Sequence, residues 1–154
     1  MEKSAIVANL KSQLQAQYNR ASNALAGAHE AATGDDTKAE GKYDTRGLEA
    51  SYLAAGQAEQ AEHLVESLAI LERFEFKEFD IDDPIAVGAL IEAEAADEIH
   101  FYLLAPVGGG FTCETEDGDT VTILGPASPL GKKFLGLTTG SVIAEPPVAI
   151  LEVM

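Results

Sequence analysis

The chain has 154 residues, a formal net charge of −16 and an isoelectric point near 4.3. So acidic a chain lacks the clustered Lys and Arg that release counterions from phosphates, which excludes autonomous binding to DNA or RNA. An apolar content of 46% suffices for a core. The single Cys113 excludes an internal disulfide framework and indicates a reducing, cytoplasmic location. No segment has the length and apolar character of a membrane span.

Two long helices are predicted in the first half, at about 4–29 and 42–71, because apolar residues recur at alternating spacings of three and four. The seam positions of the first are Val7, Leu10, Leu14, Gln17, Ala21, Ala24 and Ala28. Those of the second are Ala50, Ala54, Gln57, Ala61, Leu64, Leu68 and Leu71. The pattern predicts an antiparallel coiled-coil hairpin over residues 1–76, with its tip near 33–44.

The predicted tip is rich in carboxylates, since Asp35, Asp36 and Glu40 lie within six positions and Tyr43 follows them. At about 1.5 Å per residue the helices would extend for roughly 40 Å, farther than a domain of this size needs internally. The composition therefore indicates an acidic tip that is presented to a distant partner. A structural alternative stays open, because Thr37 and Glu40 have the spacing of a capping box, in which the two residues satisfy free amides at a helix start.

In the second half, short segments with strand-like spacing alternate with turns rich in Gly and Pro. Strands are expected at 87–94, 99–104, 111–115, 120–124, 141–144 and 149–153. Strand spacing is also found at Phe74, Phe76, Phe79 and Ile81. Ser128 and Pro129 have the form of an N-cap followed by a first helical proline, which predicts a short helix ending near Gly136. We therefore expect an α+β protein whose second domain, 77–154, is mainly antiparallel and carries one short helix.

Two segments together resemble the Gre transcript-cleavage factors of bacteria. Members of that family carry a strand, the tetrapeptide Ser-Pro-Leu/Ile-Gly and a short helix ending in Leu-Gly-Lys, and the segment 123–136 matches this order through Ser128, Pro129, Leu130 and Gly131. The family's tip pattern, Gly-Asp-x-x-Glu-Asn-Ala-Glu-Tyr, is matched in part by Gly34, Asp35, Glu40 and Tyr43. The acids here are four or five positions apart, where the family separates them by three.

The resemblance implies a coiled coil that enters the secondary channel of RNA polymerase, and an FKBP-like second domain that docks at the rim of that channel. It implies that tip carboxylates help to hold the second Mg²⁺ ion while the polymerase cleaves backtracked RNA. The corresponding tip residues are the metal ligands Asp35, Asp36 and Glu40, together with Tyr43. The implied polymerase-docking residues are Ser128, Pro129, Leu130 and Gly131. Such a factor is a monomer without turnover of its own, and it meets nascent RNA only through the polymerase.

The displaced acid spacing keeps a second function open, that of a Gre-like polymerase-binding regulator without cleavage activity, of the inhibitory or nucleoside-diphosphate-kinase-regulator type. A prolyl isomerase or chaperone is a weaker alternative, since the chain has no Trp and few aromatics to line an apolar pocket. The simplest alternative function is that of a structural adaptor. His29, His63 and His100 lie far apart without a partner at ligand spacing, so no zinc site is expected.

Overall fold

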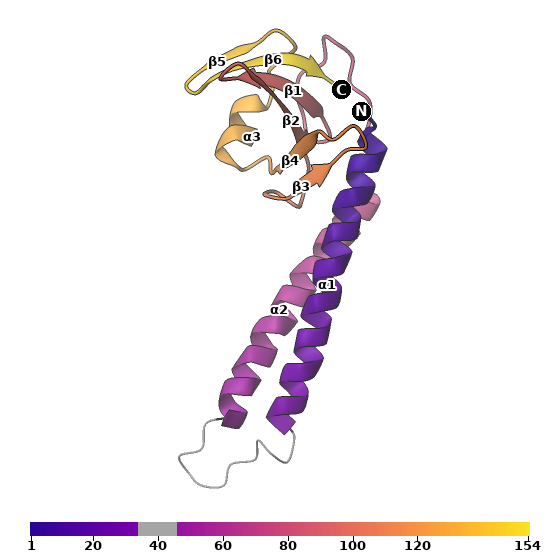
Figure 1. Ribbon diagram of the computed structural model, residues 1–154, viewed down its shortest axis with the longest axis vertical. Coiled ribbons are helices and arrows are strands. Elements are labelled where there is room, and N and C mark those ends of the chain that lie inside the picture. Colours follow the sequence, from indigo (N-terminus) through magenta and orange to yellow (C-terminus); the bar gives the residue numbers. More distant parts are fainter. Residues whose placement is uncertain (34–45) are drawn as a thin grey trace. The chain divides into compact units, whose positions relative to one another are not determined.

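The computed structural model describes residues 1–33 and 46–154, with side chains described for 1–27 and 52–154. Three helices and six strands form in this part of the chain. In chain order they are α1 (Lys3–Thr33), α2 (Arg46–Arg73), β1 (Leu90–Ala95), β2 (Glu98–Leu104), β3 (Thr112–Glu114), β4 (Thr120–Leu124), α3 (Pro129–Phe134), β5 (Val142–Ala144) and β6 (Pro147–Val153). Two long helices followed by strands and one short helix confirm the predicted α+β class (Figure 1).

The chain divides into two compact units. The sheet unit comprises Met1–Ser12 and Ile70–Met154, and the helical unit comprises Gln13–Ala69. The first turns of α1 thus belong to the sheet unit, where Leu10 is fully buried and packs so closely on Gly108 that a Cβ added there would lie 2.9 Å from its Cδ1. The domain ranges expected from the sequence, 1–76 and 77–154, stay a prediction.

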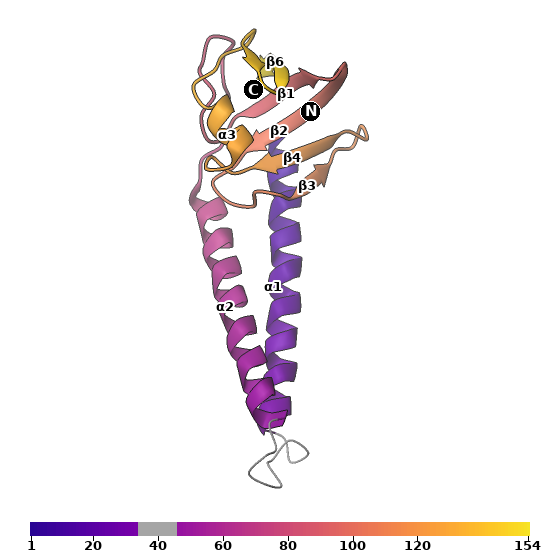
Figure 2. The same cartoon turned by 90° about the vertical axis from the view of Figure 1, so that its left-hand side faces the viewer.

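The helical unit bears out most of the predicted seam. The seam positions that are buried or half-buried are Leu14, Gln17, Ala21, Ala54, Gln57, Ala61, Leu64 and Leu68. Ala24 is exposed and Leu25 is half-buried instead, because a straight α-helix drifts by about 20° per heptad from a strict seven-residue repeat. The two helices run antiparallel and come together toward their ends at Thr33 and Arg46 (Figure 2).

The polar position in each seam has a structural counterpart. Gln17 and Gln57 line one hollow of about 290 Å³, together with Gln60 and Arg20. The two polar seam positions are therefore half-buried and lie beside the same surface hollow. Neither helix offers, over its described residues, a stretch long and apolar enough to cross a membrane.

The sheet unit contains a six-stranded sheet with the order β3-β4-β2-β1-β6-β5 (Figure 2). Four neighbouring strand pairs are antiparallel and one, β2 with β4, is parallel. The expectation of a mainly antiparallel sheet is confirmed, whereas the FKBP-like architecture that the resemblance implies stays a prediction.

The strand spacing noted between residues 74 and 81 was misleading. Within the described chain, no strand forms between Arg73 and Leu90. Phe74 and Phe76 meet edge to face, with ring centroids 4.7 Å apart, and Phe79 is buried. Ile81, by contrast, is 71% exposed. The alternation reflects aromatic rings that anchor a connecting segment, since a strand also requires a neighbouring strand to which its amides can bond.

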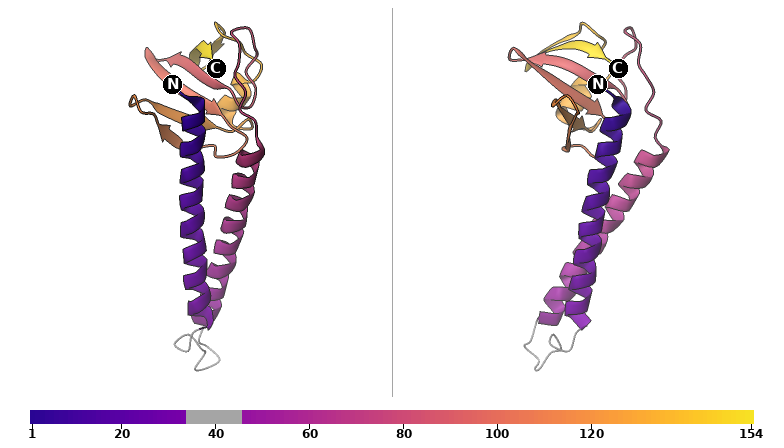
Figure 3. Two further views of the ribbon diagram at one scale, coloured as in Figure 1. Left: turned by 90° about the vertical axis from the view of Figure 1, so that its right-hand side faces the viewer. Right: turned by 45° about the vertical axis from the view of Figure 1, so that its right-hand side comes forward.

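Strand alternation gives the sheet two faces. On the first, α3 covers a core that includes Ile91, Ala93, Leu104, Phe134, Val148 and Ile150. The ring of Tyr102 packs edge-on against that of Phe134, with centroids 5.4 Å apart. The second face carries the fully buried side chains Leu90, Leu103, Cys113, Val121 and Ile123. The first turns of α1 lie on this second side of the sheet (Figure 3).

Lys3 is the buried charged residue of the described side chains, with 7% of its surface exposed. Its Nζ donates to the backbone oxygen of Lys77 at 2.6 Å and lies 5.1 Å from the ring centroid of Phe79. Burial lowers the pKa of the Lys3 amino group, and the nearby carboxylate of Glu78 opposes this in part. The contacts fix the start of α1 to the segment that follows α2.

The lowered pKa of Lys3 predicts a pH dependence of stability. Between the folded-state pKa and the unfolded value near 10.4, the unfolded chain binds more protons than the folded chain, so stability rises with pH. We expect the free energy of unfolding in urea to rise from pH 8 to 10.5 in the wild type relative to Lys3→Met. Parallel pH profiles of the two proteins would contradict this prediction.

Candidate functional site

The predicted metal ligands Asp35, Asp36 and Glu40, and the neighbouring Tyr43, lie outside the described residues. What the structure gives is the position of the helix ends around them, since α1 ends at Thr33 and α2 begins at Arg46. In the described part of the chain, no group of three or more His, Cys, Asp or Glu side chains could hold a metal ion. The proposed Mg²⁺ contact therefore stays a prediction about the connection between the helices.

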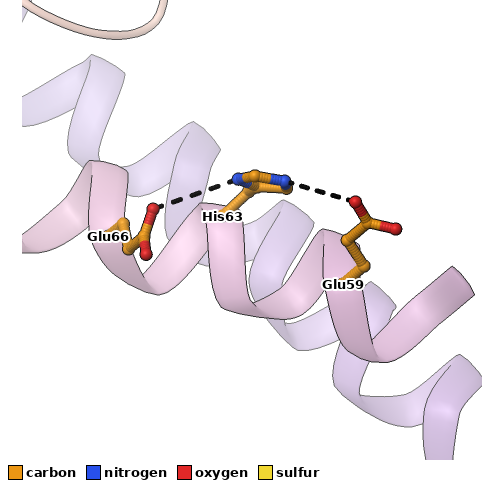
Figure 4. A network of polar contacts seen from close by, with 3 residues as sticks. All are labelled: Glu59, His63 and Glu66. Atoms are coloured by element: carbon orange, nitrogen blue, oxygen red, sulfur yellow. Dashed lines mark ion pairs between the residues drawn. The ribbon is translucent and has the colours of Figure 1, made fainter. Parts of the chain in front are cut away.

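His63, the histidine of the helical unit whose side chain the structure describes, lies on an exposed helix face. Nε2 of His63 is 3.8 Å from a carboxylate oxygen of Glu59, and its Nδ1 is 4.0 Å from one of Glu66 (Figure 4). The three residues follow one another at helical spacing, and all three side chains are at least 66% exposed. Such pairs form an ion pair only when the imidazole is protonated, and exposed pairs contribute about 0–1 kcal/mol. The network is a solvated helix face.

Ser128 caps the short helix α3 in two ways. Its hydroxyl donates to the backbone oxygen of Gly125 at 2.7 Å and accepts from the backbone N–H of Gly131 at 3.0 Å. Its backbone is extended, with φ −66° and ψ 155°, and Pro129 follows as the first helical residue. Proline suits this position because its missing N–H would have no partner there. The predicted cap, proline and helix are confirmed.

Gly131 is required by a close approach between two segments of backbone. A Cβ placed on this residue would lie 2.1 Å from the oxygen of Gly125 and 2.7 Å from Oγ of Ser128. No side chain fits in that space, and the gap is closed by the same hydroxyl that caps the helix. In the tetrapeptide Ser-Pro-Leu-Gly, the serine and the glycine thus depend on one another and on the backbone of Gly125.

The four residues implied in docking differ in what they can offer a partner. Pro129 is exposed, Ser128 and Leu130 are half-buried, and Gly131 is buried. The Leu130 side chain packs against the core under α3, and the hydroxyl of Ser128 is engaged in the cap. Three of the four residues therefore stabilise the turn or the core beneath it. Within this tetrapeptide, only Pro129 is exposed for contact with a partner.

Two exposed lysines on α3 were not predicted from the sequence as site residues. Lys132 and Lys133 lie in its last turn, and Nζ of Lys133 donates to the backbone oxygen of Glu145 at 2.7 Å. They are two of only three basic residues between positions 76 and 154, against 14 acidic ones. Two adjacent lysines in so acidic a part of the sequence were the signal from which they could have been predicted. They give α3 a local positive charge beside Pro129.

A test of the cap follows from its geometry. Ser128→Ala removes both hydrogen bonds of the hydroxyl, and we expect it to lower the free energy of unfolding by about 1 kcal/mol. Ser128→Thr keeps the oxygen and serves as the matched control, with an effect of a few tenths of a kcal/mol. Urea denaturation of the three proteins measures both values, and equal losses in the two variants would contradict the assignment.

Cys113 is fully buried in β3, and burial raises the pKa of its thiol. A thiol held in its protonated form inside the sheet is a poor nucleophile, because the thiolate is the reactive species. We therefore expect no nucleophilic role for Cys113. The exposed residues of α3 are the candidate contact site of the sheet unit.

The structure was compared with known proteins. No protein-family model and no curated protein sequence matches the chain. Among solved structures, the chain is similar to GreA factor homolog 1 (Gfh1) of Thermus thermophilus, with 18% identity, 94% of each chain covered and a TM-score of 0.36. It is also similar to a structure of the transcription factor Gfh1, with 22% identity over 97% of this chain and 93% of that one and a TM-score of 0.37. A third similarity is to Thermus aquaticus Gfh1, with 20% identity, 92% of each chain covered and a TM-score of 0.35.

Proposed function

We propose that this chain is a Gre-like factor that binds RNA polymerase, inserts its helical pair into the secondary channel and stimulates the cleavage of backtracked RNA. The observation that carries the proposal is the position of the acidic segment. Two helices of 31 and 28 residues end on either side of it, at Thr33 and Arg46. The segment with Asp35, Asp36 and Glu40 is thus the connection of a long helical pair.

The composition of the helical unit suits insertion into a narrow channel. Its seam is built from alanines, leucines and two half-buried glutamines, and alanine side chains let two helices approach closely. A helix of 31 residues is about 45 Å long. Length and small seam residues together support a function in which the helical pair enters a narrow channel.

The chemistry assigned to the connection is the supply of oxygen ligands. Mg²⁺ prefers an octahedron of oxygens and is held by one or two protein carboxylates together with water and phosphate oxygens. A pair of acids on this chain is therefore a weak site alone and becomes a complete one inside a polymerase that provides the remaining ligands. In two-metal cleavage of a phosphodiester, both ions stabilise the attacking and leaving oxygens, so the imported pair raises occupancy of the weaker metal position. The chain itself has no turnover.

The sheet unit supports the proposal through the turn at α3. The sequence Ser-Pro-Leu-Gly folds here as a rigid capped turn, because of the two bonds of Ser128 and the close approach at Gly131. That turn presents Pro129 and the neighbouring lysines to solvent. In the proposed complex, this turn is one surface that docks on the polymerase.

One observation favours a second candidate, a polymerase-binding regulator without cleavage activity. Asp36 and Glu40 are four positions apart and Asp35 and Glu40 five, where Gre factors have three. Within one turn of helix, a shift by one residue rotates a side chain by about 100°. A displaced carboxylate would then occupy the channel without completing the metal site.

The decisive assay is RNA cleavage in backtracked elongation complexes, with and without the wild-type chain. Under the first proposal, the chain accelerates the shortening of the RNA from its 3′ end and has no effect on free RNA. Absence of stimulation, together with binding that competes against an authentic Gre factor, would assign the second candidate. Cleavage of free RNA by the chain would contradict both.

A further inference from the structure

The face of the sheet opposite α3 is covered at one end and open at the other. Leu90 and Leu103 lie opposite one another on β1 and β2 and are fully buried. Two and four residues further along β1, on the same face, stand Glu92, which is half-buried, and Glu94, which is exposed. Along β1, this face of the sheet therefore passes from buried to exposed.

The strand register places apolar and acidic residues together on the open part. Glu94 lies opposite Ile99 of β2 and opposite Ala149 of β6, and Ala149 lies opposite Val142 of β5. Directly opposed residues of antiparallel strands share one face. Ile99 is 47% exposed and Val142 71%. One row across four strands thus places the exposed apolar side chains of Ile99 and Val142 in line with the carboxylate of Glu94 and the half-buried Ala149.

The neighbouring row of the open part brings two like charges together, although their repulsion does not stabilise the fold. Glu92 lies directly opposite Glu152, and like charges in that relation destabilise a sheet. The pairing of β1 with β6 shifts register at Glu92/Ala93, and such bulges re-aim side chains and are over-represented beside functional sites. In the described part of the chain, none of the three carboxylates of Glu92, Glu94 and Glu152 is held in an ion pair.

We propose that this open face, made of Glu92, Glu94, Ile99, Val142, Ala149 and Glu152, docks on a surface of RNA polymerase that bears lysine and arginine. The long alkyl stems of these residues cover apolar side chains while their charged ends reach carboxylates. Charge complementarity of this kind speeds encounter and fixes orientation. The open face is separate from the turn at Ser128, and the inference rests on the proposed function because it takes the polymerase as the partner.

The sign of the charge excludes two other occupants. A nucleic acid would bring phosphates against three carboxylates. A second copy of the chain, joined face to face, would bring six carboxylates together, and like charges across an interface cost several kcal/mol. A basic protein surface is the occupant that relieves the repulsion between Glu92 and Glu152 instead of increasing it.

The test compares two variants that lose the same three charges. The first is Glu92→Gln, Glu94→Gln, Glu152→Gln. The matched control, at the end of β3 and in the exposed turn that follows it, is Glu114→Gln, Glu116→Gln, Asp117→Asn. The dissociation constant of each full-length protein for RNA polymerase core is measured at two salt concentrations. We expect the first variant to bind at least about 10-fold more weakly, with a shallower salt dependence, and the control to bind as the wild type does.

Thermal unfolding accompanies the binding assay and separates loss of docking from loss of fold. The first variant should melt at the wild-type temperature or above it, because the repulsion between Glu92 and Glu152 is removed. Equal affinities of the two variants would overturn the inference and leave the proposed function intact. No binding by the wild type would instead overturn the proposed function, and the inference with it.

A cross-linking experiment identifies the partner surface directly. A photo-reactive benzoylphenylalanine in place of Val142 should cross-link to the polymerase beside lysines or arginines. A cross-link to an acidic segment, or none in a complex that binds with wild-type affinity, would overturn the inference.

Discussion

Replacing the three acids of the connection together, Asp35→Ala, Asp36→Ala, Glu40→Ala, is expected to reduce the stimulation of RNA cleavage by about 100-fold while polymerase binding is retained. The reason is that a metal ion supplies several kcal/mol of transition-state stabilisation, and every 1.4 kcal/mol corresponds to a factor of ten in rate. The rate of RNA shortening in backtracked complexes, measured at saturating protein and several Mg²⁺ concentrations, checks the prediction. Excess Mg²⁺ should restore part of the rate, since the variant lowers metal occupancy.

A matched control removes three exposed carboxylates from the same helical unit. Glu59→Ala, Glu62→Ala, Glu66→Ala changes the net charge equally on α2 and leaves the connection intact. It should stimulate cleavage at the wild-type rate. Full stimulation by the variant without Asp35, Asp36 and Glu40 would show that the carboxylates have no part in the reaction. Single substitutions of Asp35 and Asp36 then decide which of the two aspartates is the ligand.

Gly131→Ala is expected to cost about 3 kcal/mol in the free energy of unfolding, or to prevent folding altogether. The added Cβ would lie 2.1 Å from the oxygen of Gly125, a distance that both backbone segments must open to relieve. Overpacking in a core that can adjust costs about 1–3 kcal/mol, and here the clash is with backbone on one side and the capping hydroxyl on the other.

Gly125→Ala is the matched control for this glycine. It adds the same methyl group in the same turn, and nothing lies within 4 Å of its Cβ. We expect it to change the free energy of unfolding by less than about 0.5 kcal/mol. Urea denaturation followed by circular dichroism measures both variants. A loss in Gly131→Ala no larger than that of the control would contradict the packing account of the tetrapeptide.

Elements governed by local signals were predicted well from the sequence. The strand at Thr120–Leu124 was predicted at its observed bounds, because residues of high strand propensity stand between two turns. The start of α3 at Pro129 followed from the capping serine. The seam of the helical unit followed from its period, and Gln17 and Gln57 proved to line the same hollow.

The features that could not be predicted from the sequence depend on contacts between distant residues. The parallel pairing of β2 with β4 joins strands separated by β3, and no local pattern encodes such a choice. The spacing from Phe74 to Ile81 imitates a strand because its aromatic rings pack on the sheet unit. The clash that demands Gly131 arises from the backbone of Gly125, six residues earlier, and appears only when the turn is built.

For the candidate site, the sequence predicted which segments take part, and the geometry of the acidic segment stays a prediction. The acidic residues were identified by composition, and the structure adds that Thr33 and Arg46 are the helix ends on either side of them. Of the docking tetrapeptide, the structure assigns Ser128 and Gly131 to the architecture of the turn and leaves Pro129 exposed. The open face with Glu92 and Glu152 could not be foreseen, because its composition depends on the register between β1 and β6.

The central claim is that the chain binds RNA polymerase in the secondary channel, and competition binding tests it most directly. Fluorescently labelled chain is titrated with polymerase core, and an authentic Gre factor is then added without label. We expect saturable binding at a ratio of one to one and complete displacement by the Gre factor. Absence of binding, or binding that an excess of the Gre factor leaves unchanged, would contradict it.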